Sequence, residues 1–383
     1  DNTGRAAAIT IFGDQISATR IANISAQFQY SIQEGNAIYE QENGAVVTIE
    51  KSMLKASTGT NIDAKASVQS IKTIRYVPGE EVYALFTVVF DTAKENSYQR
   101  VGLFDRRNGF FVGYEDTVFS FSRIRDSIQY SIPIDLSEFN EKYNYEFIPQ
   151  RGNIYKISYG YLGFAPISLE VLTPEGNWAI MKRIEYPNSS TVTHTTQTFL
   201  PIRGEIGNTG NNTNLEIYSG SFSAGIVNGS NYASGRNFTW ANDNVFTVSD
   251  SATIVVFRNK ETFNLIENRV PARLLYISTA NNGNKTVRWR LLKNPNLKPS
   301  PVPIWTDVNT NNSTLEYSLN AEVYYYNSKD YFMAWNQGTI SDFFEFVKDL
   351  QLDLLPGGTA AFIVFTTGTG VDIDLSIRWN ELF

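Results

Sequence analysis

The segment Arg100–Arg125 most constrains how this chain can fold, because it describes three consecutive antiparallel strands and their turns. Apolar residues alternate with small or polar ones through Val101–Leu103, Phe110–Tyr114 and Val118–Arg125. This period of two is expected of a sheet with one buried face. Asn108-Gly109 provides the positive φ angles that a tight hairpin needs, and Glu115-Asp116 marks the next reversal. The segment therefore predicts a β-meander.

Short strand-like runs separated by turns continue through most of the chain. Val82–Phe90 is almost continuously apolar, which predicts a central strand covered on both faces. Val371–Trp379 alternates without interruption and predicts a strand near the C-terminus. Such a pattern is typical of an all-β protein with two antiparallel β-sandwich domains of the jelly-roll or concanavalin-like type.

The 383 residues fit two or three domains, and a Gly/Asn-rich stretch at 204–214 predicts an edge between them. We expect a lectin-like sandwich over residues 67–215 and a second sandwich over 216–383. Residues 1–66 carry further strand-like runs, such as Ala7–Phe12. They form either an assembly segment that contacts other chains or a part of the first sandwich.

One helix is predicted, over residues 341–351. Ser341 is a good N-cap, Asp342 and Glu345 fall in the first turn, and apolar residues follow at helical spacing. Pro356-Gly357-Gly358 would end it.

Composition excludes several kinds of function. The chain has no cysteine, which excludes disulfides, thiolate metal sites and a cysteine nucleophile. A single histidine, His194, cannot build a His-rich metal site, and it lies in a polar strand-like run. The formal charge of −7, with only short basic pairs, argues against nucleic acid as a partner. No apolar run reaches the ~20 residues that a membrane-spanning helix requires, so we expect no membrane insertion.

Paired carboxylates are the remaining route to catalysis, because glycoside hydrolysis needs two of them facing one cleft. The nearest candidates are Asp372 with Asp374, and Asp349 with Asp353. The first pair lies opposite the apolar face of its strand, and Asp353 of the second pair lies beyond the end of the predicted helix. Calcium loops, phosphate loops and nucleophile elbows find no match. We therefore predict no catalytic residue, no metal ligand and no cofactor.

The block from Asn153 to Gly210 carries a resemblance to known proteins. It contains N-I-Y-K-I-S-Y-G-Y-L-G-F-A-P-I-S-L-E-V-L, then P-N-S-S-T-V, then L-P-I-R-G-E-I-x-N-T-G. This order resembles a recurrent module of virion structural proteins in tailed phages and some large DNA viruses. Val101–Arg125 looks like the start of the same module, and Leu355–Thr359 followed by Val371–Trp379 is similar to its closing hairpin.

The resemblance implies a non-enzymatic protein of the virion: a capsid-associated, head-fibre, spike or tail component that acts in assembly or host attachment. Its expected partners are copies of itself and other virion proteins, with a cell-surface glycan as a further ligand. A glycan-binding adhesin or surface lectin, extracellular or at the cell surface, is the second hypothesis. A polysaccharide-degrading sandwich enzyme is the third.

Overall fold

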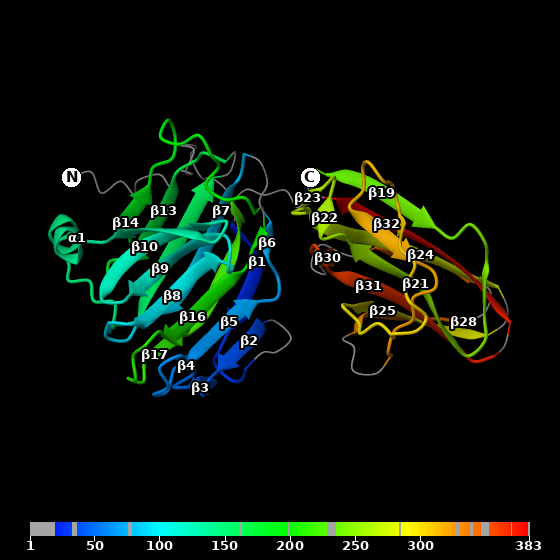
Figure 1. Cartoon of the computed structure of the whole chain (residues 1–383), viewed down its shortest axis with the longest axis horizontal. Coiled ribbons are helices and arrows are strands. Elements are labelled where there is room, and N and C mark those ends of the chain that lie inside the picture. The colour runs from blue at the N-terminus through cyan, green and yellow to red at the C-terminus, as the bar shows by residue number, and fades with distance from the viewer. Residues whose placement is uncertain are drawn as a thin grey trace. The chain divides into compact units, whose positions relative to one another are not determined.

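The computed structural model describes residues 20–32, 37–75, 79–160, 163–197, 199–227, 235–282, 285–325, 330–337, 340–345, 352–368 and 370–381. It divides into two compact units, Asp1–Ser230 and Asn231–Phe383 (Figure 1). Both are built from antiparallel sheets, so the predicted all-β class with sandwich domains is confirmed. No helix among these residues is both long and apolar enough to cross a membrane.

A seven-stranded sheet forms one layer of the first unit. Its central part is the predicted meander, since β8, β9 and β10 pair in sequence order. From one edge to the other the sheet contains β11 (Ile128–Pro133), β10 (Val118–Arg125), β9 (Gly109–Glu115), β8 (Ser97–Phe104), β16 (Ile202–Asn208), β5 (Lys65–Ser70) and β2 (Ala37–Glu42).

A six-stranded sheet forms the other layer. β7 lies inside it, between β18 and β12, as the apolar run at 82–90 predicts. The order is β1 (Arg20–Gln27), β18 (Ser221–Val227), β7 (Glu81–Val88), β12 (Asn153–Gly160), β13 (Ile167–Leu172) and β14 (Trp178–Ile184). Smaller sheets pair β17 (Glu216–Ser219) with β4 (Met53–Ser57) and β3 (Val46–Glu50), and β15 (Phe199–Leu200) with β6 (Ile74–Arg75).

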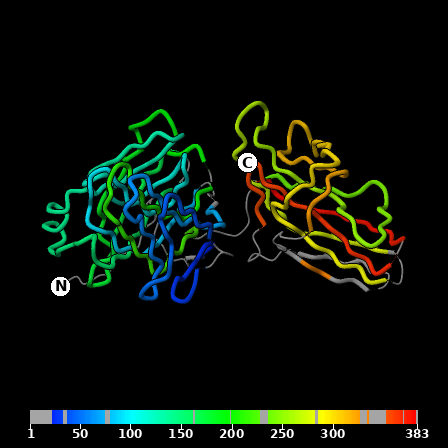
Figure 2. The backbone as a smooth tube through the Cα atoms, turned by 60° about the horizontal axis from the view of Figure 1, so that its bottom comes forward, coloured from blue at the N-terminus to red at the C-terminus, as the bar shows by residue number. Residues whose placement is uncertain are grey.

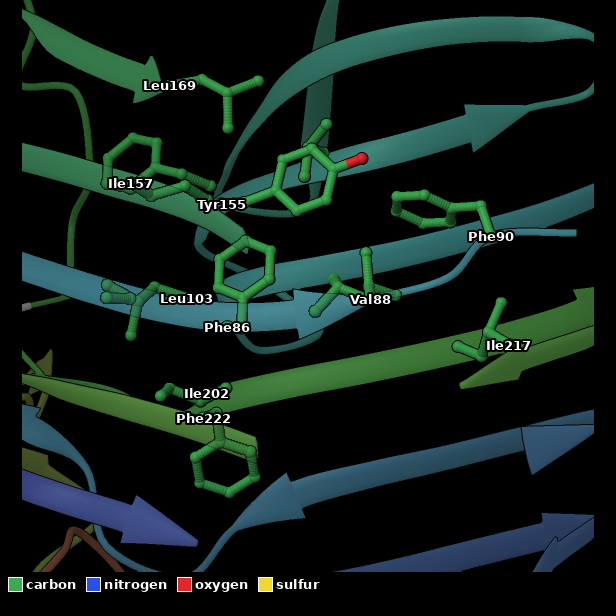
Figure 3. Packing of buried hydrophobic residues seen from close by; sticks show 14 of the residues in the cluster. Phe86, Val88, Phe90, Leu103, Tyr155, Ile157, Leu169, Ile202, Ile217 and Phe222 are labelled. Atoms are coloured by element: carbon green, nitrogen blue, oxygen red, sulfur yellow. The ribbon is translucent and has the colours of Figure 1, made fainter. Parts of the chain in front are cut away.

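The two layers enclose one apolar core (Figure 3). Phe86 and Tyr155 stack with their ring centroids 5.8 Å apart, and Leu103 and Ile202 come from the opposite layer. The residues that the sequence alternation places inward are all buried in this core: Leu103, Val112, Phe119, Ile157 and Leu169.

The N-terminal strands belong to this first sandwich. β1 and β2 are edge strands of its two layers, and β3 and β4 join β17. Two alternatives were open for residues 1–66. The strands described there complete the first sandwich. Ala7–Phe12 lies outside the described residues.

The boundary between the units lies beyond the Gly/Asn-rich stretch at 204–214. That stretch includes the end of β16 and a polar loop held against the strand by the Asn208 side chain, which donates to the Thr213 carbonyl at 3.4 Å. β17 and β18 follow it and still pair within the first unit. The stretch thus lies within the first unit, which ends at Ser230, 16 residues after Asn214.

The second unit is a further pair of antiparallel sheets, which Figure 2 traces from yellow-green to red. β32 (Val371–Glu381) is the predicted alternating strand, and its apolar face is buried from Val371 to Trp379. It lies between β19 (Arg236–Ala241) and β24 (Ala272–Asn282), with β29 (Ile340–Glu345), β20 (Phe246–Val248) and β30 (Asp353–Leu354) in the same sheet. The other sheet contains β26 (Thr306–Asp307), β27 (Leu315–Ser318), β21 (Ser251–Asn259), β31 (Thr359–Thr366), β25 (Thr286–Lys293) and β28 (Asp330–Gln337); β22 (Thr262–Phe263) and β23 (Ile266–Glu267) form a hairpin.

The helix predicted over 341–351 is wrong where the structure describes it. Residues 341–345 belong to β29, which pairs with β24 from Ile340 to Glu345, and residues 346–351 lie outside the described part. An available partner strand overrides local helical spacing, and the Phe-Phe pair at 343–344 suits a strand. The described helix is instead α1 (Leu136–Tyr143), capped by Asp135 and ended by Asn144 in the left-handed conformation.

Candidate functional site

The outer face of the seven-stranded sheet carries an array of polar and charged side chains. The register of the strands aligns every second residue into rows that cross the sheet. One row pairs Glu40 with Ser67, Ser67 with Glu205, and Glu205 with Arg100. The next pairs Gln69 with Arg203, and the row on the other side pairs Lys65 with Gly207 and Gly207 with Tyr98.

Ion pairs connect these rows into a chain of alternating charge. Arg100 binds Glu115 through Nη2 at 2.7 Å and Glu205 through Nη1 at 2.9 Å. Arg203 binds the other oxygen of Glu205 at 2.9 Å and Glu40 at 3.0 Å. The Gln69 side chain accepts a further bond from Arg203, at 2.8 Å. Each guanidinium is therefore held in one orientation, because it bonds to two or more neighbours.

A hollow of about 320 Å³ opens beside this chain of charges. Its deepest side chains are Ser67, Arg203 and Glu205, and Arg203 is only 5% exposed. Glu42, Lys65 and Arg106 line it and are exposed. A small number of precisely placed polar groups is what gives a binding pocket its specificity, and here they lie at the base of the hollow.

Tyr98 forms an aromatic wall of the hollow. Its ring lies against Gly207, where an added Cβ would be 2.5 Å from the Tyr98 hydroxyl, so glycine is required for this close approach. The guanidinium of Arg100 lies 4.4 Å from the ring centroid. Burial and the nearby Glu205 raise the pKa of Tyr98 to about 12, so its hydroxyl stays protonated and can donate a hydrogen bond at neutral pH.

The electrostatics of Glu40 are those of a permanent carboxylate. Burial alone would raise its pKa, but hydrogen bonds from Ser67 and Arg203 and the charges of Arg203 and Arg106 outweigh burial and lower it. A general acid needs the opposite shift, toward a proton held near neutral pH. Glu40 is therefore built to accept hydrogen bonds rather than to donate a proton.

The carboxylates considered from the sequence lie elsewhere, on the second unit. Asp372 and Asp374 are on the outward face of β32, where Thr247 Oγ1 donates to Asp372 at 2.8 Å and Asn242 Nδ2 donates to Asp374 at 3.2 Å. Asp353 forms a two-point ion pair with Arg273, at 2.7 and 3.0 Å. Asp349 lies outside the described residues. These groups thus form structural hydrogen bonds and ion pairs.

His194 is buried among the rings of Phe110, Tyr159 and Tyr186, at centroid distances of 5.6–5.7 Å. Its Nε2 donates to the Gly160 carbonyl at 3.2 Å. Among the residues that the structure describes, no group of three or more His, Cys, Asp or Glu side chains is placed to hold a metal ion.

The hollow was not predicted from the sequence, which pointed to none of its lining residues as site residues. A signal was present in β16, where Arg203-Gly204-Glu205 carries opposite charges on the outward positions of an otherwise apolar strand. Charges on the same face of a central strand need partners, and those partners are the neighbouring strands' own charges.

No protein-family model matches the sequence, and no curated protein sequence matches it. Solved structures do match. The match to a glycosyl hydrolase family protein from Mycobacterium fortuitum covers 53% of this chain and 99% of that protein's chain, at 8% sequence identity and a TM-score of 0.37. The match to lectin I-B4 from Griffonia simplicifolia, in its metal-free form, covers 53% of this chain and 99% of the lectin, at 13% identity and a TM-score of 0.36. The match to a legume lectin-like domain from Entamoeba histolytica covers 54% of this chain and 98% of that domain, at 12% identity and a TM-score of 0.33. At these identities the similarity is one of fold.

These matches overturn the main functional interpretation from the sequence. The three proteins are named as a glycosyl hydrolase family protein, a lectin and a lectin-like domain, and none of the three names refers to a virion component. The interpretation as a viral structural protein is therefore wrong. It rested on strand and turn motifs that any lectin-like sandwich can carry, because they encode the fold and no site.

Proposed function

We propose that the first unit is a glycan-binding module and that the hollow on its seven-stranded sheet receives the sugar. The observation that carries the proposal is the fixed array of Arg203, Glu205 and Ser67 at the base of an open hollow. Sugar hydroxyls both donate and accept hydrogen bonds. Carboxylates supply acceptors, and guanidinium and ammonium groups supply donors, at the positions that such a ligand requires.

Charge balance favours an uncharged glycan. The hollow is lined by three carboxylates and three cations, which leaves no net charge. Because the deep groups already bond to one another, they need no reordering when a ligand binds, and less conformational entropy is lost. A strongly acidic or basic ligand would gain little from such a surface.

We further propose that the module binds without hydrolysis. Retaining hydrolysis requires two carboxyl groups about 5–5.5 Å apart, one of them protonated near neutral pH. In the hollow, Arg203 bonds to both Glu40 and Glu205, and the pKa of Glu40 is lowered. This arrangement favours the charged form of Glu40 and opposes the proton-sharing of a catalytic pair.

The binding proposal predicts a selective loss of affinity when the rim of the hollow is truncated. Lys65 and Arg106 are exposed, so replacing either by alanine leaves the fold unchanged. A hydrogen bond from a charged group contributes about 1.5–3 kcal/mol, and its loss should weaken binding roughly 10- to 100-fold. A screen of neutral and acidic oligosaccharides would identify the ligand, and calorimetry on Lys65→Ala and Arg106→Ala would measure the loss.

Lys142→Ala is the matched control, because Lys142 is an exposed cation on α1 that does not line the hollow. Its affinity should equal that of the wild type. A full panel without binding at millimolar concentration would refute the proposal. Equal affinities in all three variants would refute this location.

The absence of hydrolysis is tested separately. Incubation of the protein with any oligosaccharide that binds is expected to release no new reducing ends over hours. Turnover that Glu40→Gln or Glu205→Gln abolishes would contradict the non-hydrolytic proposal and restore the enzyme hypothesis.

A further inference from the structure

The edge strand β11 differs from the other three edge strands of the two main sheets. β2 carries the charged residues Glu40 and Glu42. β14 carries Lys182 and Arg183 and pairs with its neighbour through a register shift, as β1 also does. Charges and register breaks of this kind protect an edge from pairing with another chain. β11 has neither, since Ile128–Pro133 contains no charged residue and pairs with β10 without a shift.

The exposed side chains of β11 are apolar where a protected edge would be charged. Ile128 is 74% exposed and Tyr130 is 55% exposed, and both are on the same face of the strand. Within the part of the chain that the structure describes, β11 pairs only with β10. One side of the strand thus presents backbone groups and two large apolar side chains to solvent.

The hairpin geometry determines which backbone groups point outward. Arg125 pairs with Ile128 across the two-residue turn Asp126-Ser127, and both turn residues have positive φ. In such a hairpin the pair next to the turn is hydrogen-bonded, so the N–H and C=O of Ile128, Tyr130 and Ile132 face β10. Those of Gln129 and Ser131 therefore face outward. Pro133, which lacks an N–H, is the next outward position, so the missing donor breaks no bond to β10.

This pattern is self-complementary. If two copies of β11 pair antiparallel about Tyr130, Gln129 of each faces Ser131 of the other, and each such pair can form two backbone hydrogen bonds. Ile128 then lies opposite Ile132, and Tyr130 opposite Tyr130. If the two-fold axis passed through Ser131 instead, Gln129 would lie opposite Pro133, and the backbone N–H that proline lacks would be missing from that pair. Moving the axis to Gln129 would use the Ser127 N–H, which already donates to the Arg107 carbonyl at 2.9 Å.

We propose that the protein self-associates through β11, as an isologous two-fold dimer centred on Tyr130. The two seven-stranded sheets then join into one. A strand of six residues contributes fewer contacts than the ~20–30 residues a side of a standard interface, so this dimer is weak and depends on concentration.

The pairing has a consequence for ligand binding that rests on the proposed function. Residues opposite each other in an antiparallel pair are on the same face, so the two-fold axis is perpendicular to the joined sheet. Both hollows then open on one side of the dimer. A ligand surface with repeated glycans would be held by two sites at once, and its avidity would exceed the affinity of one site.

A cysteine cross-link tests the register directly, because the chain has no cysteine of its own. Tyr130→Cys places two sulfurs at the two-fold axis, in a non-hydrogen-bonded pair with Cα atoms about 4.5 Å apart, which a disulfide can bridge. In the control Ile128→Cys, the two cysteines are offset by four residues, about 13 Å along the strands, and cannot be bridged. Mild oxidation of the full chain should give a covalent dimer with Tyr130→Cys only. Equal cross-linking of both variants, or of neither, would overturn the proposed register.

Sedimentation velocity from about 1 to 200 μM tests the association without a cross-link. The wild type should shift from monomer toward dimer over this range. Tyr130→Glu should remain monomeric at every concentration, because like charges would face each other across the axis. Ile38→Glu, at the opposite edge of the same sheet, should dimerise like the wild type. A wild type that stays monomeric at 200 μM would refute the dimer but leave glycan binding untouched, since calorimetry on the monomer measures that separately.

Discussion

Replacing Leu103 by alanine is expected to lower the free energy of unfolding of the first unit by about 2–5 kcal/mol. Leu103 is fully buried in β8 and faces the inner side of the six-stranded sheet (Figure 3). The lost side chain leaves a cavity that strands hydrogen-bonded on both sides cannot collapse to fill. For a unit of this size, the thermal midpoint should fall by roughly 5–15 °C.

Calorimetry on the full chain would check this, because the two compact units allow two transitions. Only the transition of the first unit should move. Val118→Ala is the matched control, since Val118 is on the next strand but one and is 46% exposed; its midpoint should change by less than about 2 °C. An unchanged midpoint for Leu103→Ala would show that the inward register of β8 is incorrect.

This register was predictable because it depends on neighbours in the sequence. Alternation from Val101 to Arg125 assigns each residue to a face, and the turns assign the pairing of β8, β9 and β10. The same holds for Val371–Trp379 in β32, whose buried face follows from its alternation alone. Information of this kind is local, and hairpins use little else.

The elements that sequence interpretation missed depend on partners that are distant in the chain. β29 has the spacing of an amphipathic helix, and only pairing with β24 makes it a strand. Conversely, α1 has a readable capping signal, since Asp135 accepts from the backbone N–H groups of Ser137 and Glu138. No element was predicted over these residues from the sequence.

The hollow illustrates the same limit. Arg203 and Glu40 are 163 positions apart in the sequence, yet they form an ion pair of 3.0 Å. They meet because β16 and β2 flank β5 on either side, an order that local patterns do not encode. The charges of β16 indicate that partners exist, but the sheet order determines which ones.

The second large effect concerns pH and the single histidine. Burial among aromatic rings lowers the pKa of His194 to about 4, with a smaller contribution from the charge of Arg123, although the hydrogen bond to Gly160 opposes the shift. In the unfolded chain the pKa is about 6.5. Between these values the unfolded state binds a proton that the folded state does not, so the stability of the first unit falls as the pH falls. Above a pH of about 6.5 the imidazole is neutral in both states, and the stability no longer depends on its protonation.

We therefore expect the wild type to lose about 2.5 kcal/mol of stability between about pH 7 and 4.5 through His194 alone. Chemical denaturation at both pH values, on the wild type and on His194→Gln, isolates this loss, because the carboxylates that titrate nearby are common to both proteins. The glutamine amide can still donate to the Gly160 carbonyl, but it does not bind a proton in this range. His194→Gln will be less stable at neutral pH if the ring packing is lost, and that offset cancels in the difference between the two pH values. Identical pH dependence in the two proteins would mean that His194 is accessible to protons in the folded state, and that the loop around it opens in solution.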